Sequence, residues 1–266
     1  MSQQPVLPPP TAEQIQQNQD ALAAIREEVA STQQLVGAAQ PSESLLASYS
    51  DNPGFLAHMP ALISAYSAVR TVRGDGICFY RAVLVSLGLH LHSAGSLPPG
   101  LLARMQGTKA TLVKHGYSDL LDEYVDALCA HLAGLVAPGA TAEAAAVAPL
   151  QGGGADSILY GLRLLTAAHL HENAALFEDF IMGAYMKSIA DFCAQDVLPS
   201  VEEADQIQII ALNAFLRTQC TIISLDAHAM HTNKIPEEEG TGEEAVWARL
   251  HLLLRPGHYD VLLPRV

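Results

Sequence analysis

Residues 73–82 of the chain read Arg-Gly-Asp-Gly-Ile-Cys-Phe-Tyr-Arg-Ala. Two glycines around an aspartate are typical of a tight turn. The apolar positions that follow, from Phe79 to Leu87, predict a buried helix. Cys78 is therefore expected where a loop becomes a helix, and the partial positive charge and free N–H groups of a helix start favour a thiolate. The stretch is a candidate nucleophile site, and the backbone N–H groups of residues 74–78 are candidates for an oxyanion hole.

A second stretch, residues 255–260, reads Arg-Pro-Gly-His-Tyr-Asp and is expected to be a turn that leads into a strand. In a strand, residues i and i+2 point to the same face, so His258 and Asp260 share one. Asp260 can then orient the imidazole while His258 accepts the thiol proton. On these residues alone, a buried and inert Cys78 remains the alternative, because buried cysteine is the common case.

The pattern between and around these stretches predicts helices first and strands later. Loops are expected at 90–100, 136–154 and 234–244. Helices are expected at 11–36, 44–49, 55–69, 79–87, 101–115, 118–135, 156–171, 174–182, 187–195 and 206–217, and strands at 219–225, 246–254 and 258–263. This order predicts an α+β fold in which helices flank a small, mainly antiparallel sheet.

Composition narrows the class of protein further. Of 266 residues, 50% are hydrophobic and 16% charged, which excludes wholesale disorder. The formal net charge of −14 would repel phosphate backbones, so we expect no nucleic-acid partner. No stretch reaches the roughly 18 consecutive apolar residues of a membrane span. Four dispersed cysteines and a polar, Pro-rich start without a signal-peptide core predict a soluble protein of the cytoplasm or, as an alternative, also of the nucleus.

We expect neither a metal nor a cofactor. The 11 histidines include three close pairs, but no cysteine is near enough in sequence to complete a zinc set, so the pairs are expected to be exposed. Gly74 and Gly76 lack the third glycine of a dinucleotide turn, and no Gly-Lys-Ser/Thr occurs. The remaining cysteines lie in apolar patterns and are expected in the core: Cys129, Cys193 and Cys220.

Residues 74–82 resemble the cysteine motif of the ovarian-tumour (OTU) deubiquitinases. Segments 162–166, 205–212 and 255–260 resemble the otubain branch in order and spacing, and the similarity extends from about Gln19 to the end of the sequence. The resemblance implies a papain-like cysteine protease fold. It also implies the site residues: Cys78 as nucleophile, His258 as general base, Asp260 as the third member of the triad, and Asp75 in the oxyanion loop.

The resemblance further implies a domain plan and partners. Residues 1–10 are expected to be a disordered tail, 11–39 an amino-terminal helical arm and 40–266 the OTU catalytic domain. The implied substrate is the isopeptide bond after the C-terminal glycine of ubiquitin, whose basic tail would suit an acidic groove. The arm would contact ubiquitin in polyubiquitin chains or help to block ubiquitin-conjugating enzymes.

One position departs from the family pattern, since Ile77 stands where the family usually has asparagine before the cysteine. Two alternatives to a ubiquitin isopeptidase therefore stay open. The first is a weakly active or inactive otubain-like protein that binds ubiquitin or conjugating enzymes. The second is a thiol hydrolase that acts on a ubiquitin-like modifier or another acyl substrate.

Overall fold

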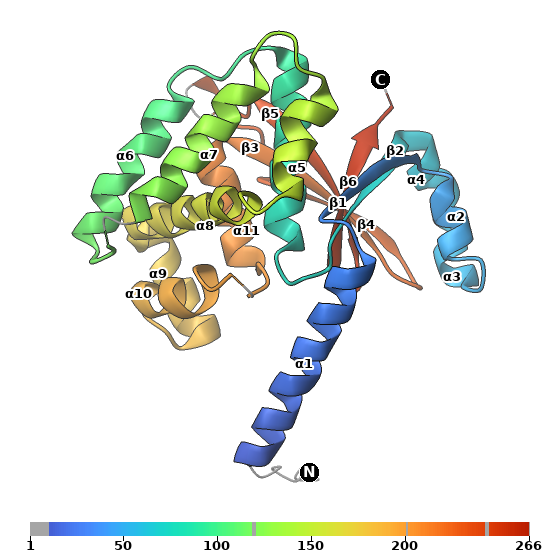
Figure 1. Ribbon diagram of the computed structural model, residues 1–266, viewed down its shortest axis with the longest axis horizontal. Helices are drawn as coiled ribbons and strands as arrows, with labels where there is room; N and C mark the ends of the chain where they lie inside the picture. The colour runs from blue at the N-terminus through green and yellow to red at the C-terminus, as the bar shows by residue number, and fades with distance from the viewer. Residues whose placement is uncertain (1–10, 119–120, 201, 243–244, 266) are drawn as a thin grey trace.

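The computed structural model describes residues 11–118, 121–200, 202–242 and 245–265, and in it the chain is built around one sheet (Figure 1). The strand order is β1-β2-β6-β5-β3-β4, and the β3–β5 pair is parallel while the other neighbours are antiparallel. Strand β2 therefore pairs with a strand that comes almost 200 positions later. The bounds are β1 (Val36–Pro41), β2 (Tyr66–Val72), β3 (Thr218–Leu225), β4 (Met230–Ile235), β5 (Ala248–Arg255) and β6 (His258–Pro264). The expected α+β class is confirmed.

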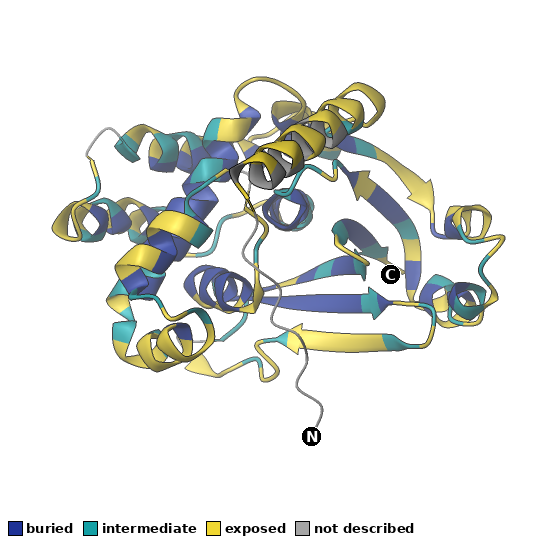
Figure 2. Ribbon diagram, turned by 90° about the horizontal axis from the view of Figure 1, so that it is seen from below, coloured by how far each residue is buried: buried dark blue, intermediate teal, exposed yellow. Residues whose placement is uncertain are grey.

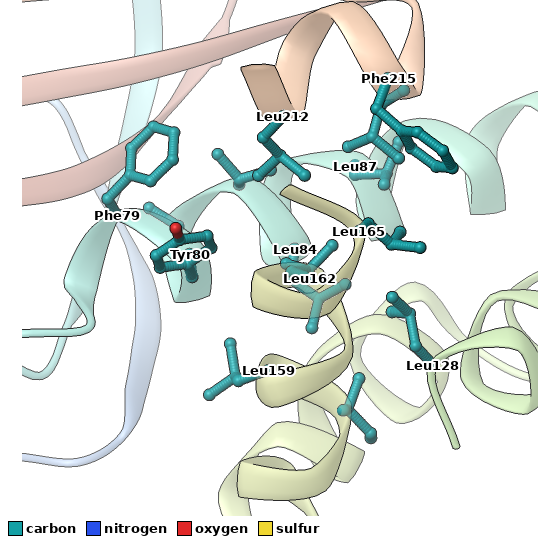
Figure 3. Packing of buried hydrophobic residues seen from close by; sticks show 14 of the residues in the cluster. Phe79, Tyr80, Leu84, Leu87, Leu128, Leu159, Leu162, Leu165, Leu212 and Phe215 are labelled. Carbon is teal, nitrogen blue, oxygen red and sulfur yellow. The ribbon is translucent and has the colours of Figure 1, made fainter. Parts of the chain in front are cut away.

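A thick helical layer packs on one face of the sheet. Its central helix is α5, whose residues from Cys78 to Val85 are all buried. Figure 3 shows Phe79, Leu84 and Leu87 of this helix among side chains from its neighbours. The layer consists of α5 (Cys78–Ala94), α6 (Leu101–Lys114), α7 (Asp122–Leu135), α8 (Ala155–Glu172) and α11 (Gln206–Leu216).

Three short helices cover the other face of the sheet: α2 (Ser44–Ser48), α3 (Pro53–Leu56) and α4 (Met59–Ala65). Side chains of successive strand residues point to opposite faces, so adjacent residues join different cores. Leu252 and Val261 belong to the core beneath the large helical layer, whereas Leu253 and Leu262 belong to the core beneath α2–α4. Both faces of the central strands are thus buried, as the dark ribbons in Figure 2 show.

The remaining elements lie at the periphery. Helix α1 (Ala12–Thr32) projects from the body as an arm, and α9 (Ala174–Tyr185) and α10 (Ile189–Phe192) pack beside α8 (Figure 1). Single π-helical turns occur at Glu143–Val147 and Cys193–Val197, and a 3-10 turn lies between Ala148 and Gln151. Among the described residues, no helix combines the length and apolarity that crossing a membrane requires. The expected tail at 1–10 lies outside the described residues.

The amino-terminal third differs most from expectation. The helix expected over 11–36 ends at Thr32, and residues 36–41 form edge strand β1, so the expected domain boundary at 39 falls within a strand. The single helix expected over 55–69 is instead α3, α4 and then β2. Pairing of β2 with β6 places Tyr66, Val69 and Val72 in buried positions, and this tertiary pairing overrides the local helical spacing.

Three expected loops contain regular structure. Helix α5 continues through residues 90–94 and ends at Gly95, whose φ of 66° allows the left-handed helix end. The segment 136–154 holds the π and 3-10 turns, and Lys234 and Ile235 of the expected acidic loop belong to β4. Asp205 caps the start of α11 and forms a capping box with Gln208.

Candidate active site

Cys78 is the first residue of α5, as the sequence predicts, and only 5% of it is exposed. The loop 73–77 enters the helix from the end of β2, and its turn requires Gly76 because φ there is 86°. The thiol therefore sits at the positive end of a 17-residue helix, where aligned peptide dipoles favour an anion.

His258 and Asp260 lie on one face of β6 beside this loop. The Nε2 atom of His258 and the Oδ1 atom of Asp260 are 2.9 Å apart. This contact leaves Nδ1 of the imidazole for the thiol. The loop meets the imidazole closely, because a Cβ placed on Gly74 would lie 3.3 Å from Nδ1. Residues 73–82 and 255–260, which are far apart in sequence, therefore lie side by side in the structure, as expected.

The carboxylate of Asp260 is completely buried and has three partners. Besides His258, the backbone N–H of Val72 donates to Oδ1 at 3.1 Å, and the guanidinium of Arg255 donates to Oδ2. Sequence reasoning missed Arg255. The available signal was its place directly before the turn, since β5–β6 pairing sets it opposite His258.

The surroundings of His258 favour the imidazolium form. Burial, the largest single effect, lowers the pKa of the imidazole, but the hydrogen bonds and the electrostatic attraction of Asp260 and Cys78 together outweigh it and raise this pKa from 6.5 to about 9. A proton held on the imidazole near neutral pH is what a thiolate–imidazolium pair requires.

Asp75 contributes to the site through the loop rather than through a free carboxylate. Arg81 donates two hydrogen bonds to it, each 2.8 Å long, and a third of 3.2 Å to the carbonyl of Arg73. Asp75 Oδ1 also accepts the N–H of Ile77 at 3.3 Å. Sequence reasoning missed Arg81, although a charged residue in an otherwise apolar buried helix signals a buried partner.

The backbone N–H groups of the loop divide into two sets. Those of Gly74 and Ile77 donate to side chains, to Gln33 Oε1 at 3.1 Å and to Asp75 Oδ1, so neither is free for an oxyanion. In the described part of the chain, the N–H groups of Gly76 and Cys78 find no acceptor. Of the backbone N–H groups expected to form the oxyanion hole, those of Gly74 and Ile77 are therefore excluded, and those of Gly76 and Cys78 remain candidates.

Clefts border both Cys78 and His258. A cleft of about 150 Å³ borders Cys78 and shares Ala204, Leu254 and Tyr259 with a groove of about 580 Å³. Three carboxylates line this continuous depression, those of Glu203, Asp205 and Glu237, against one cation, Lys234. A further cleft of about 530 Å³ borders His258 and shares Gly257 with the cleft at Cys78. Its wall includes residues 32–34, where α1 ends.

The other cysteines and the histidine pairs occupy structural positions. Burial raises the pKa values of the Cys129, Cys193 and Cys220 thiols, the last two to about 12, so these thiols are poor nucleophiles. The exposure expected of the histidine pairs is wrong for His90 and His92 and for His169 and His171, which are all half-buried. Burial lowers the pKa values of His90, His169 and His171. Within the described ranges, no three potential ligand side chains gather as a metal site.

A thiol at a helix start, an imidazole beside it and a buried carboxylate behind the imidazole define a candidate cysteine-peptidase site on an α+β fold. A family model described as Peptidase C65 Otubain matches residues 28–264. The chain belongs to this otubain family of cysteine peptidases.

Individual relatives agree with this membership. The chain is 30% identical over 258 residues to "OVARIAN TUMOR DOMAIN-containing deubiquitinating enzyme 1" of Arabidopsis thaliana, which covers 90% of this chain and 84% of the relative. It is 30% identical over 198 residues to "Ubiquitin thioesterase OTUB1" of Homo sapiens, which covers 74% and 70% of the two chains.

Solved structures share the fold over nearly the whole chain. The structure of an OTUB1 chain with ubiquitin aldehyde and UBCH5B~Ub superposes with a TM-score of 0.82 at 28% identity, covering 94% of this chain and 98% of that one. A complex with UBC13~Ub gives the same values.

Proposed function

We propose that the protein is a ubiquitin-specific thiol isopeptidase with Cys78, His258 and Asp260 as its triad. The observation that carries the proposal is the placement of the buried Asp260, the His258 imidazole and the Cys78 helix start in one line of contacts. Relatives named ubiquitin thioesterases and neighbours solved with ubiquitin aldehyde supply the substrate class.

In the acylation step, the Cys78 thiolate attacks the carbonyl carbon of the last ubiquitin glycine and a C–S bond forms. The carbonyl oxygen becomes an oxyanion that the free N–H groups of Gly76 and Cys78 can receive. The imidazolium of His258 then donates its proton to the departing lysine amine as the C–N bond breaks. The products of this step are a thioester on Cys78 and a free amine.

In the deacylation step, water attacks the thioester carbonyl. Neutral His258 accepts a proton from the water, the C–S bond breaks, and the sulfur leaves as the thiolate beside the imidazolium. Asp260 stays ionised and holds the ring in the same orientation through both steps. The cycle restores the starting charges and requires no metal or cofactor.

The clefts support an orientation of the substrate in the site. The acyl side lies with Cys78, where the groove carries three carboxylates against one lysine and so suits a basic, extended ubiquitin tail. The leaving amine lies with His258, whose cleft is walled by the end of α1. This arrangement supports contact of the arm with the protein that carries the modified lysine.

Helix α9 offers a surface for the folded part of ubiquitin. Its exposed apolar side chains include Leu176 and Phe180, which are 74% and 72% exposed. Tyr185 at the end of α9 donates a hydrogen bond to Asp205 of the acidic groove, so this surface adjoins the tail groove. An apolar patch next to an active-site groove is typical of a protein-docking site.

Replacing Phe180 with aspartate is expected to raise KM for di-ubiquitin about 10-fold with little change in kcat, because a buried aromatic contact of the complex is lost while the triad is untouched. Initial rates over a range of di-ubiquitin concentrations measure both constants. An unchanged KM would exclude α9 from the docking surface. Ala190→Asp, a change at an exposed position of the neighbouring α10, is the matched control.

Replacing Ile77 with asparagine tests the departure from the family pattern. The Ile77 side chain packs against the core of the helical layer, and the Asp75–Arg81 pair holds the loop independently of it. We therefore expect kcat to change less than about 10-fold, well below the effect of removing a direct oxyanion donor. The test compares the single-turnover rates of wild type and Ile77→Asn on the same di-ubiquitin. A gain above about 100-fold in the variant would show that Ile77 lowers the rate of the catalytic step.

The direct test of the proposed function uses a single ubiquitin molecule whose C-terminal carboxylate is replaced by an electrophile. We expect one covalent adduct, on Cys78, by peptide mapping. A parallel panel of all di-ubiquitin linkages would define which isopeptide bonds are cut. Matched probes made from ubiquitin-like modifiers would show whether the protein is instead a thiol hydrolase that acts on such a modifier.

Binding without cleavage is the second candidate function. Solved neighbours that contain UBCH5B~Ub or UBC13~Ub, together with the projecting helix α1, favour a clamp on charged conjugating enzymes. Tight binding of the ubiquitin probe without a Cys78 adduct would support this function over the isopeptidase.

A further inference from the structure

The joint between α1 and β1 binds the start of the loop that precedes Cys78. The guanidinium of Arg73 donates to the carbonyls of Ala30 and Gln33, at 3.2 and 2.7 Å, and so occupies the free carbonyls at the end of the helix. The N–H of Arg73 donates to the carbonyl of Leu35 at 3.0 Å, which continues the β1–β2 pairing. The joint is therefore held by hydrogen bonds from Arg73 to the backbone carbonyls of Ala30, Gln33 and Leu35.

The side chain of Gln33 makes a different contact. Its Oε1 atom accepts the N–H of Gly74 at 3.1 Å. Gly74 lies directly against His258, and a Cβ placed on this glycine would be 3.3 Å from His258 Nδ1 and 3.9 Å from Gln33 Oε1. Only Gly74 thus lies between the Gln33 amide and Nδ1 of His258, although Gln33 lies outside residues 73–82 and 255–260.

The loop needs such a restraint at its beginning. Its middle is held because the Asp75 carboxylate is bound twice by the buried Arg81. Gly74 has no side chain to anchor it, and its backbone can adopt many conformations unless its N–H is held. Gln33 supplies the side-chain acceptor for that N–H.

We propose that Gln33 is a positioning residue for the reaction: by accepting the Gly74 N–H, it fixes the 74–77 loop so that the Gly76 and Cys78 N–H groups face the oxyanion. The inference rests on the proposed function, since it concerns the same oxyanion. It also means that the arm and the catalytic loop share a hydrogen bond, so the amine-side cleft and the oxyanion site are mechanically joined.

The test compares Gln33→Leu, which keeps the size but lacks the acceptor, with Gln33→Glu, which keeps an acceptor oxygen. For ubiquitin carrying a C-terminal coumarin amide, we expect Gln33→Leu to lower kcat about 10-fold with KM unchanged, the effect of one indirect hydrogen bond. Gln33→Glu should retain most of the wild-type kcat. Gln195→Leu, at an exposed position outside both clefts, is the matched control and should behave as wild type.

Two further readouts separate positioning from general stability. Ubiquitin aldehyde forms a tetrahedral adduct that needs the oxyanion site, whereas alkylation of Cys78 by iodoacetamide does not. Gln33→Leu should weaken inhibition by the aldehyde about 10-fold but leave the alkylation rate and the unfolding temperature unchanged. Amide exchange of Gly74 should become faster in Gln33→Leu and stay slow in Gln33→Glu.

The outcomes distinguish the two levels of the proposal. A wild-type protein that neither cleaves the coumarin substrate nor binds the aldehyde would overturn the proposed function and the inference with it. An active wild type whose Gln33→Leu variant keeps its kcat and aldehyde affinity would overturn the inference alone. Equal losses in aldehyde binding, alkylation rate and unfolding temperature would assign Gln33 a merely structural role and would also overturn it.

Discussion

Replacing Cys78 with alanine is expected to lower di-ubiquitin turnover by more than about 10⁴-fold while ubiquitin binding stays within about 3-fold of wild type. The thiolate is the atom that bonds to the acyl carbon, and no other described side chain can replace it, since burial raises the pKa values of the remaining thiols. Binding persists because the acidic groove and α9 are unaltered. Turnover from gel-based cleavage and affinity from titration calorimetry test the two halves of this statement.

Cys129→Ala is the matched control, because it removes a thiol from the same helical layer without touching the site. It should keep full activity. Equal turnover by wild type and Cys78→Ala would end the catalytic assignment, and complete loss of ubiquitin binding in Cys78→Ala would mean that the variant had lost its fold.

Replacing Asp260 with asparagine is expected to lower kcat by about 10²- to 10⁴-fold, with a smaller change in KM. An amide fits the same space, but it presents a neutral oxygen or an N–H to His258 Nε2 and so no longer stabilises the imidazolium. The change also leaves the cation of Arg255 without its buried counter-ion.

The pH dependence gives this second prediction a distinct signature. In the wild type the pKa of His258 is raised from 6.5 to about 9, so the imidazolium and the activity that depends on it persist up to about pH 9. A raised pKa in the folded state also means a stabilising contribution that is fully present below pH 6.5 and is lost as pH rises through about 9. In Asp260→Asn, burial of the ring should dominate and move the alkaline limb of kcat/KM towards lower pH.

Rates from pH 5 to 10 and unfolding free energies at pH 6 and pH 10 provide the comparison. Leu250→Ala, a change at a buried position of the neighbouring strand β5 outside the clefts, serves as a control for altered stability. If Asp260→Asn keeps the wild-type alkaline limb, the carboxylate does not set the pKa of His258 and its place in the triad is wrong.

Much of the site could be predicted because its chemistry is encoded locally. The glycine turn before Cys78 and the i, i+2 spacing of His258 and Asp260 each specify geometry within a few residues, and both are confirmed in the structure. Asp205 likewise marks the start of α11, because its capping box with Gln208 lies within four residues of sequence. Such short-range signals need no knowledge of the remaining chain.

The missed features depend on contacts between distant segments. Strand β1 and the strand character of 66–72 arise from pairing across the sheet, which local spacing does not report. Gln33 gains its partner only when the α1–β1 joint meets the catalytic loop, whereas Arg255 meets Asp260 within the β5–β6 hairpin. Arg81 was within reach of sequence reasoning, because a buried cation requires a counter-ion.

The pairing of β2 with β6 joins the amino-terminal part of the chain to its carboxy-terminal part in one sheet. A break in the exposed Gly152–Gly154 stretch would leave the sulfur on one fragment and the imidazole on the other. Neither fragment alone would hold the complete triad, but pairing of β2 with β6 would favour reassociation of the two fragments. The protein is therefore suited to fragment complementation, in which recovered hydrolysis reports that two tethered molecules have come into proximity.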